Sequence, residues 1–136
     1  MVTISVNYDG QLRCQAVHGP SGNQLLTDAP VDNEGKGEAF SPTDLLATGL
    51  GTCLLTIIGI VGRKRGLAVE GARAEVKKEM SEDLPRRIVR LPVDIHIPLP
   101  GNHPDRALLE ERALNCPVFH SLRTDIEKVI TFHYEE

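Results

Sequence analysis

Tryptophan is absent from this chain of 136 residues, and aromatic residues make up only 4% of it. Proteins that bind single-stranded nucleic acids stack bases on aromatic side chains, and duplex-binding proteins carry clustered basic residues. Here 15 lysines and arginines are scattered among 19 acidic residues, for a net charge of −4. The composition therefore argues against a nucleic-acid partner.

Export signals and cysteine pairs are also missing. The first ten residues contain neither a basic region followed by an apolar run nor an arginine-rich amphipathic segment, so we expect a cytoplasmic protein. Cysteines occur only at positions 14, 53 and 116, an odd number without a close pair. This spacing argues against a disulfide framework and a zinc knuckle, and it leaves the thiols for packing or chemistry.

Several familiar catalytic motifs are absent. The chain has no GxSxG, HExxH, P-loop or dinucleotide-binding glycine fingerprint. His120 follows Cys116 by four residues, which suits a pair of metal ligands, but no second pair accompanies it. We therefore expect neither a metal nor an organic cofactor.

What the chain does contain is one long apolar stretch, at residues 41–65. Ser41 is a favourable N-cap, Pro42 suits the first helical position, and Asp44 can bond back to the cap. No charged residue lies between Asp44 and Arg63, and apolar residues fall on every side of the helix. We expect a central helix of one domain, surrounded by protein.

A membrane span is the weaker interpretation of this stretch. Residues 45–62 are uncharged and reach the lower length limit for a span, but they include four glycines and three threonines. We therefore expect no membrane partner. A glycine inside a helix costs about 1 kcal/mol. The glycines at positions 49, 51, 59 and 62 thus suggest that backbone or a substrate approaches closely there.

The flanking sequence predicts strands on both sides of the helix. Apolar residues alternate over residues 2–8 and 12–16 around Asp9-Gly10, which predicts a β-hairpin with one buried face and Cys14 as a small core residue. Residues 24–27 predict a third strand. Further strands are expected at 67–80, at 89–97 and at 125–134, with Pro92 placing the middle one at an edge or a bulge.

Two helical segments separate the last two strands. Residues 104–114 predict an amphipathic helix that stops at a left-handed Asn115, and residues 116–122 predict a short helical turn. The order of elements predicts one α+β domain over residues 1–136, with a mostly antiparallel sheet.

The residues alone leave the role of two cysteines open. Cys116 precedes Pro117 at a predicted helix start, where free amides favour a thiolate, whereas the apolar helix around Cys53 disfavours the charged form. Cys53 and Cys116 are either a dithiol pair that the fold brings together or two structural thiols.

Two segments resemble a known family. SPTDLLATGLGTCLLTI at residues 41–57, followed by NCPVFHSL at 115–122, closely resembles the OsmC/Ohr family of thiol-dependent hydroperoxide reductases, as does the Asp-x-Pro loop at residues 28–30. The resemblance covers nearly the whole chain. It implies an OsmC-like α+β fold, with mostly antiparallel sheets around a long central apolar helix, and an interlocked homodimer with each site at the interface.

The resemblance also implies a chemistry. Cys53 would be the peroxidatic thiolate and Cys116 the resolving thiol. In the family's peroxidases an arginine and a glutamate activate the reactive cysteine, and the nearest matches here are Arg13 in the hairpin and the shorter Asp44.

The implied function is reduction of organic hydroperoxides in oxidative-stress defence. It would proceed through a Cys53 sulfenic acid and a Cys53–Cys116 disulfide, which an external dithiol reduces. The alternative is an OsmC-like binding module that keeps an apolar pocket and has little or no peroxidase activity.

Overall fold

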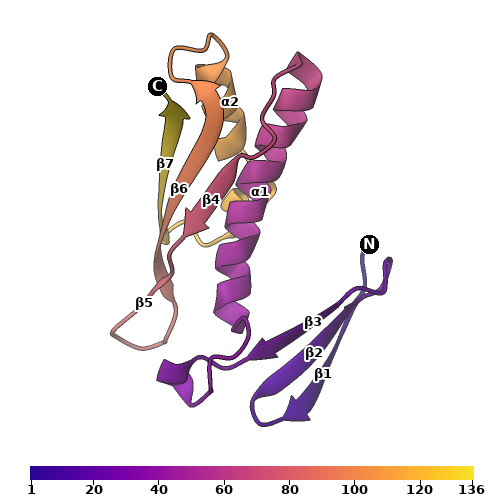
Figure 1. The fold of residues 1–136 in the computed structure, drawn as a ribbon. Coiled ribbons are helices and arrows are strands. Elements are labelled where there is room, and N and C mark those ends of the chain that lie inside the picture. The colour runs from indigo at the N-terminus through magenta and orange to yellow at the C-terminus, as the bar shows by residue number, and fades with distance from the viewer. The chain divides into compact units, whose positions relative to one another are not determined.

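A computed structural model describes residues 1–136. The chain forms two compact units, Met1–Leu46 and Ala47–Glu136. The long helix α1, Pro42–Arg65, begins in the first unit and continues through the second (Figure 1). The helix predicted from residue 41 to about 65 is therefore confirmed. Each unit has its own sheet.

The first unit is built on a three-stranded antiparallel sheet. Its strands β1 (Ile4–Gly10), β2 (Arg13–His18) and β3 (Gln24–Asp28) are paired in chain order, and a short 3-10 helix, η1 (Val31–Asn33), follows. The predicted hairpin is confirmed, but its turn differs. Gln11 and Leu12 both have left-handed φ, at 56° and 62°. This conformation costs a non-glycine residue about 1–2 kcal/mol.

One face of this sheet is apolar and exposed. Ile4, Val6 and Tyr8 are each at least 60% exposed. Cys14 lies opposite Tyr8 on β2 and is only half-buried. The predicted buried face, and the predicted core position of Cys14, are therefore wrong for the chain taken alone, because three short strands need a second layer to cover them.

The second unit is a sheet with α1 and α2 on one face (Figure 1). Its central strand is β6 (Ile88–Pro100), which pairs antiparallel with β4 (Arg73–Val76) and β5 (Glu79–Met80) and parallel with β7 (Glu127–Glu135). The helices α2 (Arg106–Leu114) and α3 (Pro117–Ser121) connect β6 to β7. The α+β class and the antiparallel pairing are confirmed, apart from the parallel β6–β7 pair.

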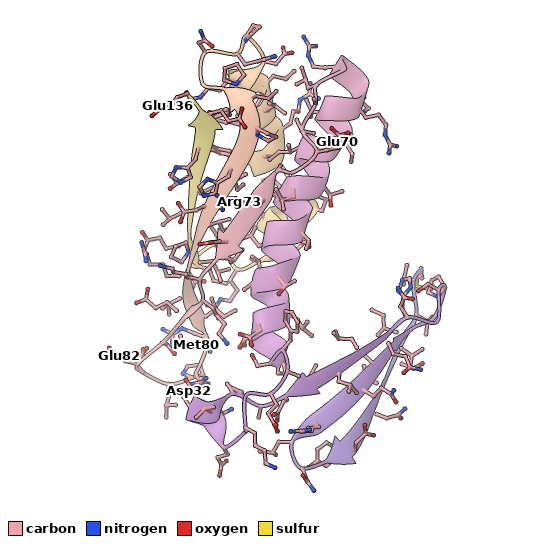
Figure 2. The ribbon with its side chains drawn as sticks, viewed as in Figure 1. Asp32, Glu70, Arg73, Met80, Glu82 and Glu136 are labelled. Atoms are coloured by element: carbon pink, nitrogen blue, oxygen red, sulfur yellow. The ribbon has the colours of Figure 1, made fainter.

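The predicted strand at 67–80 is shorter and broken. It begins only at Arg73 and pauses between β4 and β5; Figure 2 marks Arg73 and Met80 at its two ends. Pro92 accounts for the pause, since Lys77 N–H donates to the Pro92 carbonyl at 2.9 Å but proline has no N–H to return. The prediction that Pro92 marks an edge or a bulge is wrong, because β6 has neighbours on both sides and keeps its register from Val93 to Arg90; the neighbouring strand is interrupted instead.

Two smaller expectations also differ. Asn115 has φ −95°, so the left-handed stop is wrong. The chain instead tightens through bonds from Asn115 N to Arg112 O and from Cys116 N to Ala113 O, both 3.1 Å. The strand expected from residue 89 begins instead at Ile88, which is buried, because the register shifts opposite Glu79 and Met80.

The core lies between the sheet of the second unit and its helices. Every second side chain of β6 from Leu91 to Leu99 is buried, and these side chains pack against α1 and α2. The buried apolar residues are Ala47, Leu50, Leu54, Ile58, Val61, Val69, Ile88, Leu91, Val93, Ile95, Ile97, Leu99, Leu109, Ala113, Cys116 and Ile126.

α1 has a second face that the chain does not cover. Ile60 is 43% exposed, and Thr52, Thr56 and Gly59 are exposed too. The helix is long and apolar enough to cross a membrane by length and composition alone (mean hydropathy 2.1), a property shared by core helices of soluble proteins, and 39% of that window is buried. The expected enclosure on all sides is not reached within one chain.

Close packing explains two of the four helix glycines. An added Cβ at Gly62 would lie 2.6 Å from Val69 Cγ2, and one at Gly51 would lie 2.8 Å from Val76 Cγ2. At Gly59 nothing lies within 4 Å, and at Gly49 the Val118 side chain is at ordinary contact distance. The expected close approach is thus confirmed at Gly51 and Gly62.

We expect Gly62→Ala to lower the free energy of unfolding by about 1–3 kcal/mol, because the new methyl group overpacks the contact with Val69. Gly59→Ala is the matched control, and its better helix propensity should add up to about 1 kcal/mol of stability. Denaturant unfolding of both variants measures the difference. Equal stabilities would contradict the packing described for Gly62.

Candidate functional site

Cys53 lies midway along α1, at the border between its buried and exposed faces. Its side chain is partly buried and packs against the core. On the exposed side, Thr52 Oγ1 donates to Thr48 O at 2.9 Å and Thr56 Oγ1 donates to Thr52 O at 2.7 Å. Because these hydroxyl protons are used by the helix backbone, the surface next to Cys53 is more apolar than its sequence suggests.

Cys116 lies between α2 and α3 and is fully buried. It is the N-cap of α3: its backbone is extended, with φ −68° and ψ 146°, and its sulfur accepts a hydrogen bond from Phe119 N at 3.3 Å. Pro117 occupies the first helical position. The short helix predicted from the Cys-Pro sequence is therefore confirmed.

The fold brings the two thiols together and makes Cys116 a weak acid. Burial raises the pKa of Cys116 from its ordinary value of 9.0 to about 11, the Phe119 amide lowers the pKa in part, and the neighbouring Cys53 side chain raises it again. Removing a thiolate from water costs more than one amide hydrogen bond returns. The expectation that the helix cap favours a thiolate at Cys116 is wrong, because burial outweighs the cap.

Two adjacent thiols with unequal exposure have the arrangement that a dithiol–disulfide couple requires. Cys53 presents part of its surface, whereas Cys116 is covered by protein. Oxidation of Cys53 to a sulfenic acid would place an electrophilic sulfur next to the Cys116 thiol, and condensation of the two gives a disulfide and water. The arrangement is therefore suited to two-electron redox chemistry.

Arg13 belongs to a separate charged cluster in the first unit. Its guanidinium, 40% exposed, lies 3.5 Å from Asp28 Oδ2 and forms an ion pair with Glu38. Asp28 is 1% exposed, and its Oδ2 also accepts from Glu38 N at 3.0 Å. Arg13 Nε and Asp28 Oδ1 are buried without a hydrogen-bond partner. The strained turn at Gln11 and Leu12 immediately precedes Arg13.

Asp28 and Glu38 are the two residues that sequence reasoning missed as partners of Arg13. Asp28 stood out only as the start of the Asp-x-Pro loop, and Glu38 is one of four charged residues in the connector that follows. The direct signal is the pairing of Arg13 with Asp28 across β2 and β3, which becomes visible only with the strand register.

Asp44 completes a capping box at the start of α1. Its Oδ2 accepts from Ser41 N at 2.9 Å, while Asp44 N donates to Ser41 Oγ at 3.0 Å. The predicted capping role is confirmed. Arg13 and Asp44 lie in the first unit and the two neighbouring thiols in the second, so their joint action on peroxide stays a prediction.

No group of three or more His, Cys, Asp or Glu side chains gathers in a geometry that fits a metal ion. His120, considered above with Cys116, has its Nε2 3.1 Å from Asn115 Oδ1.

Comparison with known proteins identifies the family. Residues 35–130 match the family model described as OsmC-like protein. The chain belongs to the OsmC-like family. None of the curated proteins matches this OsmC-like chain. A solved structure from Psychrobacter arcticus, named for osmotic-stress induction and a detoxification response, is 46% identical, with 98% of this chain and 96% of that chain covered and a TM-score of 0.91.

More distant structures share the fold of this OsmC-like protein. An organic hydroperoxide resistance protein OsmC from Legionella pneumophila is 16% identical, with 98% and 96% coverage and a TM-score of 0.78. An organic hydroperoxide resistance protein from Vibrio cholerae, solved with captopril in one of its active sites, is 19% identical, with 97% and 90% coverage and a TM-score of 0.76. The OsmC-like fold, with its long central helix, is thereby confirmed.

The raised pKa of Cys116 predicts a pH dependence of stability. Folding favours the protonated thiol, so this stabilisation is complete below pH 9 and is lost as the pH rises to about 11. The loss should be on the order of 2 kcal/mol. Comparing urea unfolding at pH 8 and pH 11 measures it.

Cys116→Ala should lose less free energy of unfolding between pH 8 and pH 11 than the wild type, and Cys14→Ala should lose as much as the wild type. Tyr134, whose pKa is raised by burial and by Glu110, titrates alike in all variants and drops out of the comparison. An undiminished loss in Cys116→Ala would contradict the assignment.

Proposed function

We propose that this OsmC-like protein is a cysteine-based peroxidase that reduces organic hydroperoxides with electrons from an external dithiol. The observation that carries the proposal is the pairing of a partly exposed Cys53 with a fully buried Cys116. The family match supports it, and so do fold relatives named for organic hydroperoxide resistance. Stress defence in a reducing compartment such as the cytoplasm fits this chemistry.

The proposed reaction uses only the two thiols and a reductant. The Cys53 thiolate attacks the distal peroxide oxygen, the O–O bond breaks, and the alkoxide leaves as the alcohol after taking a proton. The Cys53 sulfenic acid then condenses with the Cys116 thiol, which releases water and forms the disulfide. An external dithiol reduces the disulfide and becomes a disulfide itself.

The surroundings of Cys53 favour an alkyl hydroperoxide over hydrogen peroxide. The threonine hydroxyl protons beside it are bonded to the helix backbone, and Cys53 itself packs against the apolar core. Such a wall offers dispersion contacts to an alkyl chain and few donors to a small polar peroxide.

The family resemblance assigns activation of Cys53 to Arg13, with Asp44 as the matching carboxylate. Arg13 keeps 40% of its side chain exposed. Asp28 and Glu38 both bond to its guanidinium and hold its orientation. In this assignment Arg13 supplies the positive charge that favours a thiolate at Cys53. Asp44 acts first through the capping box that starts α1.

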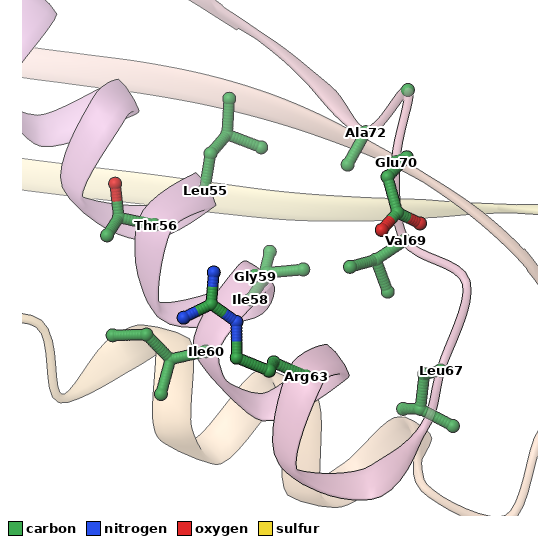
Figure 3. Close-up of a pocket in the computed structure, with 11 residues that line it drawn as sticks. Leu55, Thr56, Ile58, Gly59, Ile60, Arg63, Leu67, Val69, Glu70 and Ala72 are labelled. Carbon is green, nitrogen blue, oxygen red and sulfur yellow. The ribbon is translucent and has the colours of Figure 1, made fainter.

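A second copy of the chain is the proposed cover for the exposed apolar surfaces. A groove of about 700 Å³ runs along α1 and the loop before β4 (Figure 3). Ile60 and Gly59 lie on its helix side, and Val69 lies on the loop side. Ile60 on the helix, and Ile4, Val6 and Tyr8 on the open face of the first sheet, are exposed apolar side chains of the kind that mark protein–protein contacts. A homodimer would bury them.

The binding-module alternative is favoured by one observation. Arg13 is engaged by two carboxylates, Asp28 and Glu38, which reduce the positive charge that it can offer to a thiolate. Under this alternative the chain would bind an apolar ligand and turn over no peroxide. Steady-state turnover of cumene hydroperoxide with a dithiol separates the two functions.

The cysteine variants test the peroxidase directly. One equivalent of alkyl hydroperoxide should consume two thiols per wild-type chain, form the Cys53–Cys116 disulfide and leave Cys14 free. Cys53→Ser should abolish the reaction, whereas Cys116→Ser should undergo one oxidation and accumulate a sulfenic acid at Cys53. Mass spectrometry of the treated variants measures these products. A sulfenic acid on Cys116 in Cys53→Ser would overturn the assignment.

The dimer is tested by placing a charge in the groove. Ile60→Lys should convert the dimer to a monomer in sedimentation at low micromolar concentration, because burying an unpaired ammonium at an apolar interface costs several kcal/mol. Leu84→Lys is the matched control: Leu84 is 86% exposed in the turn before β6, outside the groove. A wild-type monomer would contradict the proposed dimer.

A further inference from the structure

The proposed catalytic cycle contains two sulfur atoms that differ in their access to solvent. Cys116 has no exposed surface, because it lies under the first turn of α3 and against the core. Cys53 is partly exposed at the border of the uncovered side of α1, and it does not line the groove that the proposed dimer would bury. A thiol that arrives from solution therefore reaches the Cys53 sulfur more easily than the Cys116 sulfur.

The cover over Cys116 is anchored at several points. His120 Nε2 lies 3.1 Å from Asn115 Oδ1, which ties α3 to the residue before Cys116. Lys128 Nζ lies 5.1 Å from the ring centroid of Phe119 and donates to the carbonyls of Arg123 and Ile126 at 3.1 Å each. The bond from Phe119 N to Cys116 Sγ closes the turn itself. These contacts hold α3 and the chain that follows it in place beside the buried Cys116.

We propose that the external dithiol attacks the Cys53 sulfur of the Cys53–Cys116 disulfide, and not the Cys116 sulfur. This inference rests on the proposed function. The reductant thiolate bonds to Cys53 Sγ, the S–S bond breaks, and its electron pair moves to Cys116 Sγ, which takes a proton from water. The second thiol of the reductant then attacks the reductant sulfur that is bonded to Cys53. This step releases the Cys53 thiolate and the reductant as a disulfide.

In this step, solvent access favours attack at Cys53, whereas the pKa of the departing thiol favours attack at Cys116. A thiol with a raised pKa leaves more slowly, so chemistry alone would favour attack at Cys116 with Cys53 departing. Attack requires the nucleophile to approach along the S–S axis, however, and protein covers that approach to Cys116. The Phe119 amide, 3.3 Å from the Cys116 sulfur, also stabilises the charge on Cys116 as it departs.

The buried resolving thiol also makes the step directional. Once released, Cys116 is protonated at neutral pH, because burial raises its pKa to about 11. Attack on a disulfide requires a thiolate, so protonated Cys116 seldom attacks the mixed disulfide to re-form the internal bond, whereas the more electrophilic sulfenic acid condenses with the thiol itself. The reductant's second thiol therefore completes the reduction.

The test uses glutathione, a monothiol that stops at the mixed disulfide. The chain carrying Cys14→Ser, which removes the third thiol, is oxidised with diamide instead of peroxide, so that loss of peroxidase activity cannot affect the result. One equivalent of glutathione is added for a short time, the reaction is quenched in acid, and free thiols are alkylated after denaturation. Peptide mass spectrometry then locates the glutathione and the alkyl group.

We expect glutathione on Cys53 and the alkyl group on Cys116, in about tenfold excess over the reverse pattern. Phe119→Ala, which trims the cover, should raise the share of glutathione on Cys116. Glutathione mainly or equally on Cys116 in the covered chain would overturn the proposal. So would failure of diamide to form the disulfide, or failure of the disulfide to react with glutathione.

Discussion

A helix too apolar for water, in a chain too short to enclose it, is the constraint on which the rest of this structure depends. The sheet around β6 and the helix α2 cover one side of α1 with close-packed aliphatic side chains. Gly51 and Gly62 allow Val76 and Val69 to approach the helix axis. The opposite side keeps Ile60 and Gly59 exposed, and Cys53 lies at the border of the two sides.

The solvent access of each thiol separates the two cysteines. Cys116 has the features that lower a thiol pKa, a helix cap and an amide hydrogen bond, yet its pKa is raised because it has no solvent. Cys53 lacks a helix cap but is open on one side. A nucleophile needs both access and charge, and in this chain access separates the two residues more clearly than local hydrogen bonding does.

Much of the fold was predictable from the sequence, because its signals are local. The cap at Ser41, the uncharged run to Arg63 and the period-two pattern around Ile95 place α1 and β6 within a few residues. The break between β4 and β5 was not predictable, since its cause is a proline on the neighbouring strand, which has no N–H to complete the pairing. The Arg13–Asp28–Glu38 cluster likewise depends on strand register, and the burial of Cys116 depends on how α3 packs.

The exposed apolar sheet face shows where reasoning from a single chain misleads. Alternation in β1 correctly indicates an apolar face, but a pattern specifies only that a face must be buried and not what buries it. The same holds for α1, whose second face has the composition of a core without its contacts. Because Cys53 borders that uncovered face, a cover over the face would also shape access to Cys53. In the proposed peroxidase, assembly and redox chemistry would therefore be linked through one surface of one helix.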